Sequence, residues 1–82
     1  MYTELREIKS GEVYRHFKGS LYRIICVAKH TENGESLVIY EDLSDTEKRW
    51  ARPLSMFNSL VDKEKYPHIS QKYRFEKTGN SN

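Results

Sequence analysis

Apolar and polar positions form their clearest pattern in the middle of the chain, across residues 21–43. Residues 21–30 read LYRIICVAKH and residues 37–43 read LVIYEDL, and both runs are rich in the β-branched and aromatic side chains that favour strands. Between them lies Asn33-Gly34, a pair that readily adopts the positive φ angles of a tight hairpin turn. The pattern therefore predicts a β-hairpin at the centre of a small β domain.

The register of this hairpin depends on the length of its turn. A two-residue turn places Ala28 opposite Ile39, whereas a three-residue turn with a bulge places Ala28 opposite Val38 and Cys26 opposite Tyr40. We favour the bulged register because it collects five side chains on one face of the sheet. These are Ile24, Cys26, Ala28, Val38 and Tyr40.

Shorter segments on either side predict further strands. Residues 12–17 alternate but leave neither face purely apolar, which is typical of an edge strand or of a strand that faces a ligand. Residues 44–47 have the composition of a loop. Residues 48–52 predict a fourth strand that ends at Pro53, because proline cannot donate to a sheet ladder. Residues 73–76 could supply a fifth strand.

One short helix is expected after the fourth strand. Ser55 can cap a helical turn over residues 56–61. Spacings of three and four then place three apolar side chains on one face, namely Phe57, Leu60 and Val61. The charged segment 62–71 is expected to be a loop. Four or five short strands with one helical turn indicate a small barrel or sheet roll.

Length and composition indicate one domain. The 82 residues are divided into an N-terminal arm at 1–9, a β domain at 10–76 and a flexible tail at 77–82. The chain has 14 Lys and Arg against 12 Asp and Glu, a net charge of +2, which is too small to imply nucleic acid by itself. Six Tyr and one Trp argue against a disordered chain.

Targeting and redox signals are sparse. The single Cys26 lies in an apolar run, so we expect a buried and inert thiol and no internal disulfide. No apolar stretch is long enough to span a membrane, and no signal-peptide core is present. We therefore expect a cytoplasmic protein with no membrane partner.

Three blocks of sequence resemble a family of small bacterial proteins classed as a domain of unknown function. They are Y-R-H-F-K-G at 14–19 after Gly11, A-K-H-T-E-N-G-E at 28–35 followed by Val38 and Tyr40, and W-A-R-P-L-S-M-F at 50–57 with a late Arg74-Phe75. The resemblance covers about residues 10–76. It implies an all-β, SH3-like barrel of four to five strands with one short helix. It implies no biochemical activity, and the segment from 61 to 74 is longer than is usual in the family.

The histidines do not predict a metal site. His16 and His30 flank the two ends of one long strand, which at about 3.3 Å per residue separates them by roughly 30 Å if it is straight. His68 is isolated in the polar loop. No nucleophile turn and no glycine-rich phosphate loop are present, so we expect neither a catalytic centre nor a cofactor.

Two kinds of binding site remain open. At one end of the hairpin, His30, Glu32 and Arg52 could bind an anion or a polar ligand. The favoured alternative is that Glu32 and Arg52 form an ion pair or hydrogen-bond the turn backbone, while His30 caps a strand. At the other end, His16 lies with Lys18 and Asp42 on a rim that is expected to be solvated.

An aromatic and basic face lies between these ends. Tyr14, Tyr40 and Trp50 interleave with basic residues, as in sites where rings stack bases and cations meet phosphates. Alternatively, Tyr40 and Trp50 are core residues, whereas Tyr14 is expected to be exposed.

The sequence therefore predicts a small binding module. The leading ligand is RNA or single-stranded nucleic acid, and the rivals are a protein or peptide partner and a small molecule or anion. The expected ligand-binding residues are Tyr14, His16, His30, Glu32, Tyr40, Trp50 and Arg52.

Overall fold

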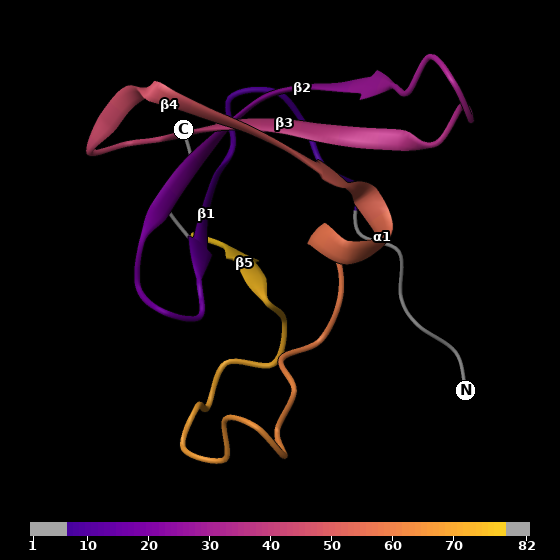
Figure 1. Ribbon diagram of the computed structural model, residues 1–82. Coiled ribbons are helices and arrows are strands. Elements are labelled where there is room, and N and C mark those ends of the chain that lie inside the picture. The colour runs from indigo at the N-terminus through magenta and orange to yellow at the C-terminus, as the bar shows by residue number, and fades with distance from the viewer. Residues whose placement is uncertain (1–6, 79–82) are drawn as a thin grey trace.

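One antiparallel sheet of five strands and one short helix make up the fold (Figure 1). The computed structural model describes residues 7–78, and the arm and tail predictions for residues 1–6 and 79–82 lie outside them. The elements are β1 (Val13–His16), β2 (Leu21–Lys29), β3 (Ser36–Asp42), β4 (Asp45–Pro53), α1 (Leu54–Phe57) and β5 (Phe75–Lys77). The strand order is β4-β3-β2-β1-β5, so β4 and β5 are the two edges. The predicted all-β class with one short helix is confirmed.

The central hairpin is confirmed, but both expected registers are wrong. Cys26 lies opposite Ile39 and Ala28 opposite Leu37, because the turn spans residues 30–35 rather than two or three residues. The Asn33 side chain stabilises this longer turn, since its Oδ1 accepts the Glu35 N–H at 2.9 Å.

A β-bulge lies inside β2, between Ile24 and Cys26, and not at the turn. The extra residue, Ile25, reverses the alternation of the rest of the strand. Cys26 therefore faces away from Ile24, and its side chain is exposed. The prediction that the Cys26 thiol is buried was wrong for this reason.

Two connections differ from expectation. The loop expected at 44–47 is instead a tight turn at Leu43-Ser44, where Asp42 Oδ1 accepts both the N–H and the hydroxyl of Ser44 at 2.9 and 2.7 Å. Strand β4 consequently begins at Asp45. Strand β5 begins two residues later than predicted.

Helix α1 is shorter than expected and begins one residue before Ser55. Pro53, with φ of −53°, precedes the helix, and no side chain caps it. The predicted Ser55 cap was therefore wrong. Phe57 and Val61 are buried as expected, but Leu60 is 50% exposed.

Aromatic rings dominate the core. Phe57 of α1 stacks on Phe75 of β5 with ring centroids 4.2 Å apart and an interplanar angle of 9°. The remaining members of the core are Tyr14, Ile24, Val38 and Tyr40, which share one face of the sheet. We call this the inner face, and the opposite side, which carries Arg23, Cys26 and Ile39, the outer face.

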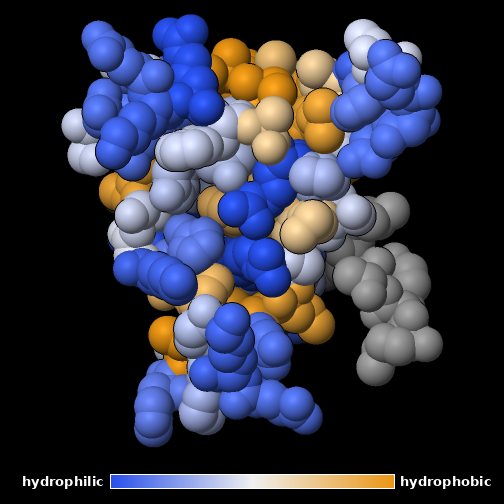
Figure 2. All heavy atoms as spheres, viewed as in Figure 1, coloured by the Kyte–Doolittle hydropathy of each residue, from blue (hydrophilic) through white to orange (hydrophobic). Residues whose placement is uncertain are grey.

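Two polar segments project from the sheet. In Figure 2 the loop of residues 62–71 forms a mostly hydrophilic projection at the bottom, and the turn at 30–35 forms another at the upper right. Within the described residues, no helix is long and apolar enough to cross a membrane.

Candidate functional site

Strand pairing brings four of the sequence-predicted site residues to the inner face. Trp50 lies directly opposite Tyr40, and Arg52 lies two residues further along β4 on the same face. His16, at the end of β1, lies opposite Phe75 of β5. The sheet therefore collects residues from β1, β3, β4 and β5 that are far apart in the sequence.

Two adjoining pockets form here. The first, which we call the aromatic pocket, has a volume of about 210 Å³. It is lined by His16, Tyr22, Tyr40, Trp50, Arg52 and Phe75. The Arg52 Nε donates a hydrogen bond to the Tyr40 hydroxyl at 3.1 Å, and its guanidinium carbon lies 5.3 Å from the centre of the Phe75 ring. Trp50 is 49% exposed, so its ring is available to a ligand.

The second pocket, which we call the basic pocket, has a volume of about 300 Å³ and shares His16 and Arg52 with the first. Its lining comes from the end of β1 and the following turn, the end of β4, the loop after α1 and the residue before β5. The lining residues are His16, Phe17, Lys18, Arg52, Asp62, Lys65, Tyr66 and Arg74.

The four cations of the basic pocket form no ion pair with a carboxylate of the described residues. Within residues 7–78, the ion pairs involve other lysines and arginines, and none includes Lys18, Arg52, Lys65 or Arg74. The one carboxylate in the lining, Asp62, accepts hydrogen bonds from the backbone N–H groups of the next turn, at 3.0 Å from Glu64 and 3.3 Å from Lys65. The pocket therefore carries a surplus of positive charge.

One of these cations also holds an uncommitted donor. The Nε of Arg74 is buried and has no hydrogen-bond partner among the described residues. A buried donor without an acceptor is costly, by about 1–3 kcal/mol. An anion in the basic pocket is the kind of group that removes such a cost.

Burial and the neighbouring cations both act on the imidazole of His16. Burial, together with the positive charges of Arg52, Lys18 and Arg74, lowers the pKa of His16 from 6.5 to about 4. The ring packs between Phe17 and Phe75, with centroid distances of 4.4 and 4.9 Å. His16 is therefore neutral at pH 7, and it can donate one hydrogen bond without adding charge.

Two of the predicted tyrosines are core residues of the inner face. Tyr14 is 1% exposed, so the expectation that it is exposed was wrong: its ring packs edge-on against Phe57, with centroids 5.3 Å apart. Its hydroxyl donates to Glu12 at 3.1 Å. Tyr40 is also buried and contributes to the site through its hydroxyl and not through an open ring face.

His30 and Glu32 belong to the hairpin turn. The Glu32 N–H donates to His30 Nδ1 at 3.0 Å, which fixes the imidazole against the turn backbone. Within the described residues, no hydrogen bond or ion pair joins either side chain to Arg52. The ion pair expected between Glu32 and Arg52 is therefore absent from this part of the chain.

Sequence reasoning missed Lys65, Tyr66 and Arg74. The segment 62–71 has the composition of a solvated loop, and nothing local shows that it returns to the end of β1. The available signal was Tyr66, a tyrosine in a mostly polar loop, whose ring centroid lies 4.8 Å from that of Phe17.

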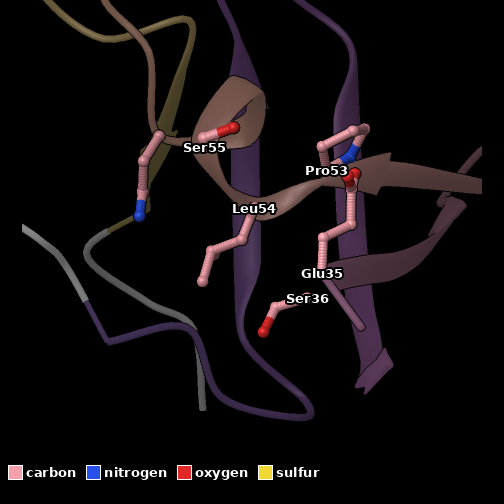
Figure 3. Close-up of a pocket in the computed structure, with 6 residues that line it drawn as sticks. Glu35, Ser36, Pro53, Leu54 and Ser55 are labelled. Atoms are coloured by element: carbon pink, nitrogen blue, oxygen red, sulfur yellow. The ribbon is translucent and has the colours of Figure 1, made fainter. Parts of the chain in front are cut away.

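A third pocket lies at the start of α1, away from these cations. It has a volume of about 280 Å³, and Figure 3 shows Leu54 between Ser55 on one side and Ser36 and Glu35 on the other. Glu35 is its one charged lining residue, so the pocket lacks the cluster of cations that a phosphate needs. Within residues 7–78, no group of three or more potential metal ligands is present.

These features define a small all-β domain with a basic and aromatic pocket on the inner face of its sheet. The family model described as "Protein of unknown function (DUF1653)" matches residues 12–77. The chain therefore belongs to the DUF1653 family. A crystal structure of a DUF1653 protein from Bordetella bronchiseptica is similar, with a TM-score of 0.72 and 28% sequence identity over 93% of this chain and 94% of that chain. No curated protein matches this chain.

Proposed function

We propose that this domain binds single-stranded nucleic acid, with a phosphate in the basic pocket and a base on Trp50. The observation that supports the proposal is a set of cations that form no ion pairs within residues 7–78 and that lie beside an exposed indole ring. Cations that have no carboxylate partner are free to meet phosphates, and an exposed ring can stack on any base. Arg52 lines both pockets, so one ligand can contact both.

The protein or peptide alternative has weaker support. An acidic peptide satisfies the cations, but it leaves the exposed Trp50 ring without a specific role. A small anion likewise fills only the basic pocket. A nucleotide unit combines an anionic group with a planar ring, and this combination matches the adjoining pockets.

Binding can be measured by fluorescence anisotropy with labelled RNA and DNA oligomers of mixed sequence, over a range of salt concentrations. The Lys18→Ala/Lys65→Ala variant removes two phosphate-facing charges. The slope of log affinity against log salt should therefore become shallower by about 1.4, at about 0.7 per charge for a single strand. Trp50→Leu removes the stacking surface and should cost about 1–3 kcal/mol, or roughly 5- to 150-fold in affinity.

The matched control is the Arg15→Ala/Lys29→Ala variant, which also removes two exposed positive charges, but away from both pockets. It should keep most of the affinity, since these charges act only over distance. Absence of binding to every oligomer at low salt contradicts the proposed function. Equal losses in the control and in Lys18→Ala/Lys65→Ala contradict the assignment to the basic pocket.

A further inference from the structure

The basic pocket has more positive charge than one internal phosphate needs. We propose that it receives a terminal phosphate, so that the domain prefers a strand with a phosphorylated end to the same strand with a hydroxyl end. This inference rests on the proposed function and specifies the part of the nucleic acid that enters the basic pocket.

The charge of the lining favours a terminal phosphate. Lys18, Arg52, Lys65 and Arg74 contribute four positive charges and Asp62 one negative charge, which leaves +3 around a space of about 300 Å³. A phosphodiester within a strand carries a single negative charge. A phosphomonoester carries about −1.5 to −2 at pH 7, because its second pKa is near 6. The monoester therefore gains more from each cation.

The donors also favour a group with three free oxygens. Among the described residues, the Arg74 Nε donates to no acceptor, and Lys18 and Lys65 form no ion pair with a carboxylate. The cations reach the pocket from a turn, a strand end, a loop and the segment before β5. A terminal phosphate presents three non-bridging oxygens to these donors, whereas an internal phosphate presents two. An internal phosphate is also connected to the strand on both sides, so the pocket would have to leave room for two exits.

His16 adds a neutral donor to this set. Its Nδ1 accepts the Lys18 N–H at 3.1 Å, so the proton of the neutral ring lies on Nε2. Histidine is the side-chain type whose charge ordinarily changes between pH 5 and 8, and burial and three cations keep the pKa of His16 near 4. The other titratable residues in the lining are lysine, arginine, aspartate and tyrosine. The change in charge between pH 5.5 and 7.5 therefore belongs to the terminal phosphate of the ligand.

The test compares oligomers of one sequence that carry a 5′-phosphate, a 3′-phosphate or hydroxyl groups at both ends, by anisotropy at pH 7.5 and 5.5. We expect at least one phosphorylated end to bind about tenfold more tightly than the hydroxyl-ended strand at pH 7.5. The preference should shrink at pH 5.5, where the phosphate loses its second charge.

The Lys65→Ala variant should reduce the preference for the phosphorylated end about threefold or more. Lys65 is exposed, and thermal melting followed by circular dichroism checks that the variant folds. Lys29→Ala, on the hairpin strand, is the matched control and should keep the full preference.

The outcomes separate this inference from the proposed function. Equal binding of phosphorylated and hydroxyl-ended strands overturns the terminal-phosphate inference and leaves the proposed function standing. A preference that grows at pH 5.5 also overturns it, because a titrating group of the protein then controls binding. Absence of binding to all three oligomers overturns both.

Discussion

The positively charged side chains of the inner and outer faces of this sheet differ in their ion pairing. On the outer face, Arg23 and Arg49 flank Glu41 across three strands, with N–O distances of 3.3 and 3.9 Å. At the inner face, the cations of the basic pocket surround a neutral histidine and lack ion pairs within the described residues. A sheet that needed only stability could pair both sets. This difference is the one that the proposed binding of an anionic ligand at the inner face predicts.

The largest expected effect concerns the packing of side chains on the two faces of the sheet. Phe75 is 1% exposed and supports Arg52, whereas Ile39 of the outer face is partly exposed. We expect Phe75→Ala to lower the free energy of unfolding by about 3–5 kcal/mol, because it leaves a cavity in the core. Ile39→Ala should cost less than about 2 kcal/mol. Urea denaturation measures both, and similar losses contradict the assignment of the core to the inner face.

A second test uses the titration of His16. The pKa of His16 is lowered to about 4 in the folded protein, against 6.5 ordinarily, so between these values the unfolded chain binds a proton that the folded chain does not. The free energy of unfolding should therefore fall as the pH drops from 6.5 towards 4, by on the order of 2 kcal/mol after allowance for partial exposure.

Urea denaturation of the wild type and of His16→Gln between pH 7 and 5 measures this slope. Because glutamine does not titrate, the variant should have a flatter profile. The outer face provides the comparison, since Glu41→Gln should leave the histidine-dependent slope in place. Identical profiles for wild type and His16→Gln disprove the linkage between His16 and the cations of the pocket.

The smallest effects on stability come from the carboxylates of the two faces. Asp62→Asn keeps a side-chain oxygen for the turn and removes the one negative charge of the basic pocket, so oligomer affinity at low salt should rise about threefold. Glu41→Gln also removes one negative charge, but it frees Arg23 and Arg49 on the outer face. It should change stability by less than about 1 kcal/mol and raise affinity less than Asp62→Asn does. A larger rise in affinity for Glu41→Gln than for Asp62→Asn contradicts the inner-face site.

Local sequence patterns predicted most of the secondary structure. The hairpin, the strand around Trp50 and the strand near Phe75 are confirmed because each depends on short-range alternation and turn chemistry. The register failed because the Asn33-Gly34 pair does not reveal that the turn spans residues 30–35. The bulge at Ile25, which turns Cys26 outward, has no distinct local signature in a run that is apolar on both faces. The buried state of Tyr14 was missed because the ring that covers it, Phe57, is distant in sequence.

By itself, the sequence determined the all-β class, the central hairpin and several of the residue types at the candidate site. His16, Trp50 and Arg52 were singled out from their local surroundings. Only the tertiary structure brought His16 and Arg52 into one pocket and added Lys65 and Arg74 to it. The physical reason is that β1 pairs with β5, which returns the distant loop to the end of β1. The charge of such a pocket depends on contacts between strands that are not neighbours in the sequence.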